Sequence, residues 1–218
     1  MKSIRPVNSL IILLLAAILA SSLAASPVQA ADSPPKKAYI RSVNGWPQRF
    51  NLSCESRSAV DWAAFWGVEI SETKFLKKLP RSDNPNKGFV GQPSDPLGRI
   101  PPDSYGVHAG PVAELLREYG LQAEARNGIA WKELKMEIAA GRPVIVWVIG
   151  QMWKGNSVEY QASDGETIQV AAYEHTMLLV GYNSTSVRAI DAATGLAQDY
   201  PLRNFLASWG VLGNMAIT

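Results

Sequence analysis

The sequence has a single cysteine, Cys54, and only two histidines, His108 and His175, among its 218 residues. One cysteine cannot form a disulfide within the chain, and so few histidines and cysteines cannot make the clusters that usually bind zinc. A glycine-rich phosphate-binding loop is also lacking. We therefore predict no metal and no cofactor.

An excess of charge of either sign is also lacking once the N-terminal segment is set aside. Lys2 and Arg5 precede an apolar run from Leu10 to Leu23, and Val28-Gln29-Ala30 is a small-residue cleavage pattern. This layout predicts a secretory signal peptide. Its removal leaves 19 Lys and Arg against 19 Asp and Glu. A nearly neutral chain gives no support for a nucleic-acid or membrane-surface partner.

The predicted domain organisation follows from this segment. Residues 1–30 are the signal peptide, residues 31–37 a linker, and residues 38–218 one domain long enough to bury a core. We expect the mature protein to be secreted or on the exterior of the cell envelope, after cleavage near Ala30. We expect no stable membrane insertion after signal cleavage, because the apolar run is shorter than the roughly 20 residues of a membrane span. An uncleaved segment that serves as a membrane anchor is the alternative. An unpaired thiol in this compartment is an inert buried residue, an intermolecular link or a reactive group.

The apolar pattern predicts an α+β domain of papain-like design, in which a central N-terminal helix packs on an antiparallel sheet. Residues 54–66 are apolar on most sides, which indicates a buried helix, and Gly67 is placed to end it. Residues 79–105 are rich in proline and glycine and predict a long irregular connection, with Phe89, Val90, Leu97 and Ile100 packed down. Further helices are expected at 72–78, 112–119, 131–140 and 201–209, and strands at 38–43, 121–126, 143–149, 158–161, 167–172, 175–182, 186–191 and, at an edge, 214–217.

The start of the first long helix is suited to a nucleophilic thiol. A thiol attacks as the thiolate, and a helix N-terminus places partial positive charge near Cys54. Gln48, six residues upstream, can supply a side-chain donor for the oxyanion that forms on attack.

A later hairpin can supply a base and a residue to orient it. If three residues, Asn183 to Thr185, form its turn, Met177 lies opposite Asp191. His175 is then a diagonal neighbour of Asp191 on the same face, within reach of longer side chains. A turn with an even number of residues would place the two on opposite faces. His108 is the rival base, although its Gly/Pro-framed position fits a loop or cleft-lining role better.

The order Gln48, Cys54, His175, Asp191 resembles the papain-like cysteine peptidases, and is most similar to the bacteriocin-processing (double-glycine) peptidase family. The similarity covers residues 38–218. It rests on the six-residue Gln–Cys step, the segments E-H-T-M-L-L-V-G-Y and D-A-A-T-G, and the G-F-V-G and Y-G-V segments around Phe89 and Tyr105.

The resemblance implies a secreted cysteine peptidase that acts through a thioester intermediate on a peptide or protein substrate. By position, it implies Cys54 as nucleophile, His175 as base and acid, Asp191 as orienter and Gln48 as oxyanion donor. Two residues depart from the family: Glu55 replaces the usual glycine, and Ala192 a frequent proline. A carboxylate beside the thiol raises the thiol pKa, so a catalytically inactive binding domain is an alternative function. A cell-wall peptide hydrolase is another.

Overall fold

The computed structural model describes residues 33–218, and Ser33–Thr218 forms one compact unit. The predicted signal peptide lies outside the described residues. Within residues 33–218, no helix is long and apolar enough to cross a membrane. The predicted α+β architecture is confirmed, with five helices in the described part of the chain and a sheet of seven antiparallel strands.

The central helix is α2, Cys54–Phe65, one residue shorter than predicted. It ends where Gly67 adopts a φ of 81°, a left-handed conformation that glycine adopts without steric cost. Ser53 is the N-cap residue but makes no side-chain capping bond. Its hydroxyl instead donates to Glu72 Oε1 at 2.7 Å, which ties the start of α2 to the neighbouring helix α3, Glu72–Lys78.

The main sheet is built around two strands that are buried along their whole length, β3 (Val144–Ile149) and β6 (Glu174–Tyr182). Its order is β2-β9-β3-β6-β7-β8, with β1 also paired to β6. The remaining bounds are β1 Ala38–Tyr39, β2 Ala125–Arg126, β7 Ser186–Asp191, β8 Ala197–Pro201 and β9 Ala216–Ile217, while β4 Val158–Gln161 and β5 Thr167–Val170 form a separate hairpin.

Two strand predictions were wrong. The C-terminal strand β9 is not at an edge, because it lies between β2 and β3. Strand β8 was missed, since four of its five residues are exposed and it carries no alternating apolar pattern. Strands β1 and β2 have two residues each and are therefore shorter than predicted.

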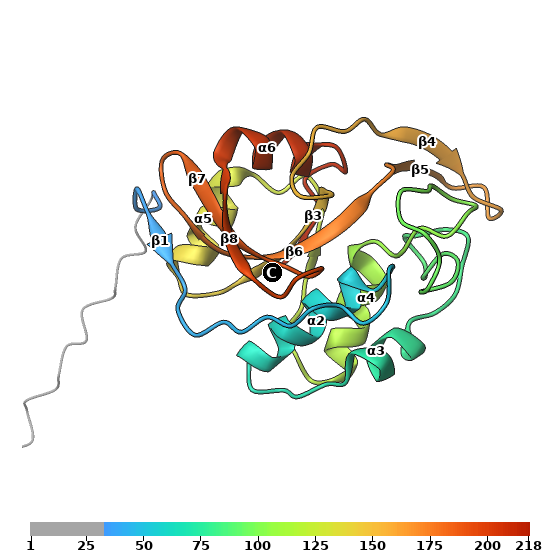
Figure 1. Cartoon of the computed structure of the whole chain (residues 1–218), viewed down its shortest axis with the longest axis horizontal. Coiled ribbons are helices and arrows are strands. Elements are labelled where there is room, and N and C mark those ends of the chain that lie inside the picture. Colours follow the sequence, from blue (N-terminus) through green and yellow to red (C-terminus); the bar gives the residue numbers. More distant parts are fainter. Residues whose placement is uncertain (1–32) are drawn as a thin grey trace, which may run out of the picture. The chain divides into compact units, whose positions relative to one another are not determined.

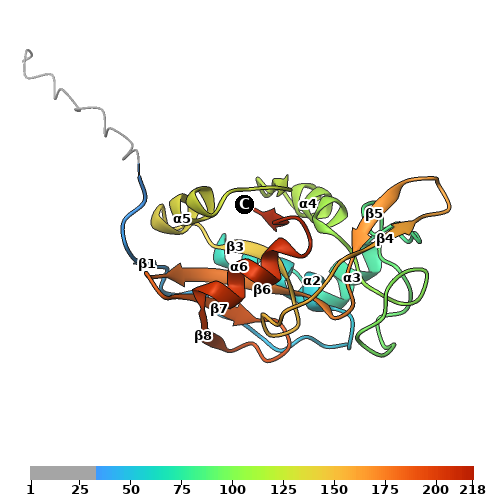
Figure 2. The ribbon, with the colours of Figure 1, turned by 90° about the horizontal axis from the view of Figure 1, so that it is seen from above.

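Helices cover both faces of the sheet, which explains why β3 is an unbroken apolar run. Figure 1 shows α2, α3 and α4 (Ala109–Glu118) grouped on one side of the sheet and α6 (Leu202–Gly210) on the other. Figure 2 shows the same elements from above, with α5 (Trp131–Ala139) beside β1. Alternate residues of β3 enter two cores: Ile145 and Trp147 pack with α2 and α4, and Val146 and Val148 with α5 and α6.

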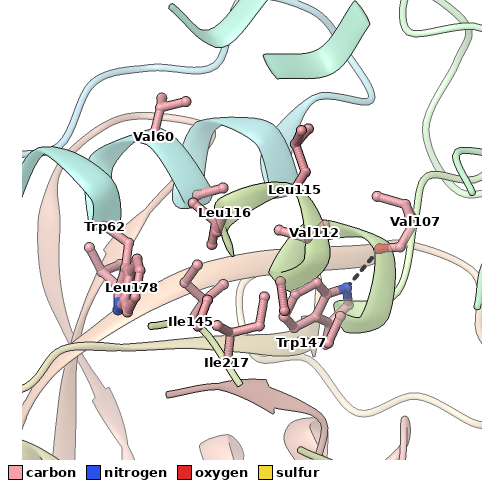
Figure 3. Close-up of a cluster of buried hydrophobic side chains, with 14 of the residues drawn as sticks. Val60, Trp62, Val107, Val112, Leu115, Leu116, Ile145, Trp147, Leu178 and Ile217 are labelled. Atoms are coloured by element: carbon pink, nitrogen blue, oxygen red, sulfur yellow. Dashed lines mark hydrogen bonds between the residues drawn. The ribbon is translucent and has the colours of Figure 1, made fainter. Parts of the chain in front are cut away.

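The core on the α2 side joins the helices to the sheet (Figure 3). Leu116 of α4, Ile145 of β3 and Leu178 of β6 are all at most 1% exposed. Trp147 is also buried, and its indole Nε1 donates to the Val107 carbonyl at 3.0 Å, so a core tryptophan also satisfies the backbone just before α4. This packing holds α2 against the middle of the sheet.

The irregular segment predicted at residues 79–105 contains no named helix or strand. Phe89 and Val90 are buried as predicted, each at 1% exposure, whereas Leu97 is 50% exposed and that prediction was wrong. Val90 forms a bridge with Gly106, and Gly106 lies against the Glu55 side chain at the start of α2.

Candidate active site

The hairpin β6–β7 brings His175 and Asp191 together by a different route from the one predicted. Tyr182 pairs with Val187, not with Ser186, and the turn is closed by a hydrogen bond from Asn183 N to Ser186 O at 2.9 Å. The register then shifts between Leu179 and Gly181, which is a β-bulge. The extra residue restores the pairing of Met177 with Asp191.

His175 and Asp191 form a hydrogen bond of 2.7 Å between Nε2 and Oδ1. Burial by itself raises the pKa of Asp191, but the hydrogen bond and charge of His175 and the Ala193 N–H outweigh it and lower that pKa. Ala193 N donates to the same Oδ1 at 2.9 Å, and Gln151 Nε2 approaches Oδ2 at 3.5 Å. A carboxylate only accepts hydrogen bonds, so Nε2 carries a hydrogen and Nδ1 of the neutral ring keeps its lone pair.

Cys54 is the first residue of α2 and is 2% exposed. Its thiol donates to Glu55 Oε2 at 3.3 Å. Burial raises the pKa of the Cys54 thiol well above its ordinary value, and the charges of Glu55 and Glu174 raise it further, against a hydrogen bond from the Thr176 backbone that lowers it. Within residues 33–218, no hydrogen bond joins the thiol to the His175 ring.

Strand β6 presents Thr176 and Glu174 to α2 and His175 to the other face of the sheet. Thr176 Oγ1 is hydrogen-bonded to Ser58 Oγ of α2 at 3.0 Å. Because side chains alternate along a strand, Glu174 shares the face of Thr176, while His175 shares that of Met177. Glu174 thus lies beside Cys54 and Glu55, with side-chain ligand atoms of all three within 4.8 Å of one another.

Glu55 is held in place by the backbone that follows the irregular segment. Its Oε1 accepts a hydrogen bond from Val107 N at 2.6 Å. Gly106 has a φ of 129°, and a Cβ there would overlap Glu55 Oε1, so both the backbone and the close approach require glycine. Burial raises the pKa of Glu55 to about 7, in spite of hydrogen bonds that lower it. Burial and the charge of Glu55 raise the pKa of Glu174 well above its ordinary value.

Gln48 lies just upstream of α2, but both hydrogens of its side-chain amide are engaged. Nε2 donates to the carbonyls of Phe50 and Asn51, each at 2.7 Å. The backbone N–H of Gln48 donates to Ala192 O at 2.7 Å, next to Asp191. The Gln48 loop is thereby tied to the β7 end of the site. Its role as oxyanion donor stays a prediction.

His108, the rival base, is the N-cap residue of α4 and is 2% exposed. Both ring nitrogens are engaged: Nδ1 with Asn86 Oδ1 at 2.8 Å and Nε2 with Tyr105 Oη at 3.2 Å. Burial lowers its pKa to about 4. These contacts fit the structural role predicted for His108.

Three polar neighbours of the site were not identified from the sequence: Glu174, Thr176 and Gln151. Glu174 carried a signal, because it precedes His175 in a segment predicted as a strand, and alternation gives it the face opposite to His175. Thr176 carried the same signal. Gln151 had none, since its approach to Asp191 depends on the turn after β3.

The family of the chain follows from the comparison with known proteins. Residues 40–217 match the Peptidase_C39 like family, so the chain belongs to this family. The family resemblance predicted from the Cys54, His175 and Asp191 motifs is thereby confirmed. No curated protein sequence matches the chain.

Two solved structures are similar in fold. A putative C39-like peptidase from Bacillus anthracis has a TM-score of 0.74 and 24% identity, over 84% of this chain and 96% of that chain. A double glycine motif protease from an AMS/PCAT transporter, in complex with the leader peptide, has a TM-score of 0.50 and 15% identity, over 85% and 95%. Both likenesses support a papain-like C39 fold.

Proposed function

We propose that the chain is a secreted cysteine peptidase in which Cys54 is the nucleophile, His175 the general base and acid, and Asp191 the residue that orients the imidazole. The observation that carries this proposal is the 2.7 Å hydrogen bond between His175 Nε2 and Asp191 Oδ1. It leaves Nδ1 with a lone pair on the strand against which the Cys54 helix is packed. The family of the chain supports the same reaction class.

The reaction would require the Cys54 thiol to leave Glu55 and to meet the ring of His175 at the start of β6, although strand alternation points the His175 side chain to the face of β6 opposite to α2. One rotation about χ1, between staggered conformers, moves Sγ off Glu55 Oε2. His175 Nδ1 then accepts the thiol proton, and the thiolate attacks the carbonyl carbon of the substrate. The protonated His175 gives its proton to the leaving amine, and water hydrolyses the thioester. Asp191 stabilises the imidazolium throughout.

The oxyanion would be stabilised at the start of α2. The Cys54 N–H belongs to the first turn of the helix and has no acceptor within it, and the helix dipole favours negative charge there. Gln48 is the proposed second donor. It would exchange its bond to Phe50 O or Asn51 O for one to the oxyanion.

Labelling with a thiol-directed peptidyl probe tests the proposal. Wild-type protein should be labelled and Cys54→Ala should not. His175→Ala should label at least tenfold more slowly, since a positioned general base contributes about 10² to 10⁴ in rate. His108→Gln is the matched control, with the second histidine of the chain changed, and should label at the wild-type rate once its fold is verified. Equal labelling of His175→Ala and wild type would refute the base assignment.

An inactive binding domain is the second candidate, and the burial and carboxylate contact of the Cys54 thiol favour it. A fully active enzyme should hydrolyse at least one substrate in a panel of unfolded peptides and purified peptidoglycan, and peptidoglycan alone would favour the cell-wall hydrolase. An inactive domain should hydrolyse neither substrate, and its Cys54→Ala variant should keep the biological effect of the wild-type protein.

The proposed secretion has its own test. N-terminal sequencing of the protein recovered outside the producing cells should begin at Ala31. A chain that keeps Met1 and stays with the membrane would refute cleavage near Ala30.

A further inference from the structure

Three possible metal ligands meet where α2 packs on β6. Cys54 Sγ and the carboxylates of Glu55 and Glu174 lie within 4.8 Å of one another, and all three residues are buried. The first two come from the start of α2 and the third from the start of β6. Packing of the two elements therefore assembles the cluster.

Glu174 has no protein partner to compensate its carboxylate. It is 4% exposed, and neither Oε1 nor Oε2 makes a hydrogen bond within residues 33–218. A buried carboxylate without a partner is costly and calls for an explanation. Within the same residues, no Lys or Arg forms an ion pair with Glu55 or Glu174.

The spacing of the Cys54 and Glu55 donors suits a small tetrahedral ion. Zinc binds thiolate sulfur at about 2.3 Å and carboxylate oxygen at about 2.1 Å, which places two such ligands about 3.5 Å apart. Cys54 Sγ and Glu55 Oε2 are 3.3 Å apart. Glu55 is also oriented from outside the cluster, because Val107 N donates to its other oxygen at 2.6 Å. A partner of this kind fixes a ligating carboxylate.

The donor set distinguishes between ions. A thiolate with two carboxylates suits a borderline-soft ion such as Zn²⁺, whereas Ca²⁺ and Mg²⁺ prefer sites made only of oxygen. Three protein ligands also leave the fourth tetrahedral position for water.

We propose that Cys54, Glu55 and Glu174 form a binding site for a zinc-type divalent cation. Binding releases the thiol proton, and any proton on the two carboxyl groups, to solvent, with no change in oxidation state. The bound ion takes one lone pair of the sulfur and lowers the nucleophilicity of the thiolate toward a substrate. Cation binding thus blocks the proposed peptidase reversibly. This consequence rests on the proposed function, whereas binding itself does not.

Cobalt(II) is the probe, since it takes tetrahedral zinc sites and reports a thiolate ligand by a charge-transfer absorption in the near ultraviolet. Chelator-stripped protein should bind one Co²⁺ with this band, and Zn²⁺ should abolish it. Cys54→Ser should lack the band, and Glu174→Gln should bind at least tenfold more weakly. Asp61→Asn, a buried acid changed further along α2, is the matched control and should bind as wild type does.

Absence of the band in wild-type protein overturns the proposal, as does equal affinity of Glu174→Gln and wild type. If Glu174→Gln does not fold, the proposed site is tested by whether Zn²⁺ protects Cys54 of the wild-type protein from alkylation. Zn²⁺ should slow its alkylation by iodoacetamide at least tenfold, and no protection overturns the site. Peptide hydrolysis is measured separately with chelator present. Hydrolysis without Co²⁺ binding refutes this site alone, whereas Co²⁺ binding without hydrolysis refutes the peptidase alone.

Discussion

Replacing Glu55 with glutamine should flatten the pH dependence of stability between pH 4.5 and 7. Glu55 is fully buried, and its pKa rises from the ordinary 4.5 to about 7. The folded state therefore binds the proton more tightly than the unfolded state. The stability from this proton is fully present below pH 4.5 and is lost as the pH rises to 7. At 1.36 kcal/mol per pKa unit, the loss is about 3 kcal/mol, a large part of the roughly 5–15 kcal/mol of a typical domain.

Urea unfolding, followed by tryptophan fluorescence at several pH values with chelator present, measures this effect. The free energy of unfolding of wild-type protein should fall by about 3 kcal/mol more than that of Glu55→Gln over this range. Asp61→Asn is the control. Burial also raises the pKa of Asp61, to about 6, so this variant measures how much of the pH dependence of stability comes from Asp61 and not from Glu55. Parallel curves for wild type and Glu55→Gln would refute the reasoning.

Two further predictions concern the support of the site. Gly106→Ala should lower the free energy of unfolding by about 3–5 kcal/mol, from backbone strain and loss of the bond from Val107 N to Glu55. Gly120 also has a positive φ, but a Cβ there would meet no atom within 4 Å, so Gly120→Ala should lose less stability. Equal shifts of the melting temperature in the two variants would contradict the overlap at Gly106. Asp191→Asn should slow labelling of Cys54 at least tenfold at pH 7, because an amide can donate to Nε2 and place the ring hydrogen on Nδ1. Unchanged labelling would argue against Asp191 as the orienter.

Local signals in the sequence predicted most of the fold. The bounds of α2, α3 and β7 were predicted to within one residue, because apolar spacing and polar or glycine ends mark them. Leu97 shows the limit of these local signals. In an irregular segment no periodicity tells which apolar residue faces the core, and this one is exposed.

The candidate site was predictable only in part, since its geometry depends on long-range packing. The pairing of Met177 with Asp191 was predicted correctly from a wrong turn, because a bulge that no residue type signals compensated for the different turn. The effect of Glu55 on the thiol pKa was predicted in direction. Burial is the larger cause, and Glu174 contributes as well. Neither the burial of Cys54 nor the nearness of Glu174 can be predicted from the sequence, because both depend on the packing of α2 on β6.

Because of the bulge at Val180, the number of residues between His175 and Asp191, odd or even, decides whether the two side chains share a face of the sheet. His175 and Asp191 are 16 residues apart, and that interval holds both a two-residue turn and one extra residue in β6. If the turn keeps two residues, deleting one codon from it would send His175 and Asp191 to opposite faces of the sheet, unless the bulge were lost in the same event. Removing two codons, or exchanging the bulge for a longer turn, would keep them together. Insertions and deletions in this hairpin should therefore be tolerated in pairs.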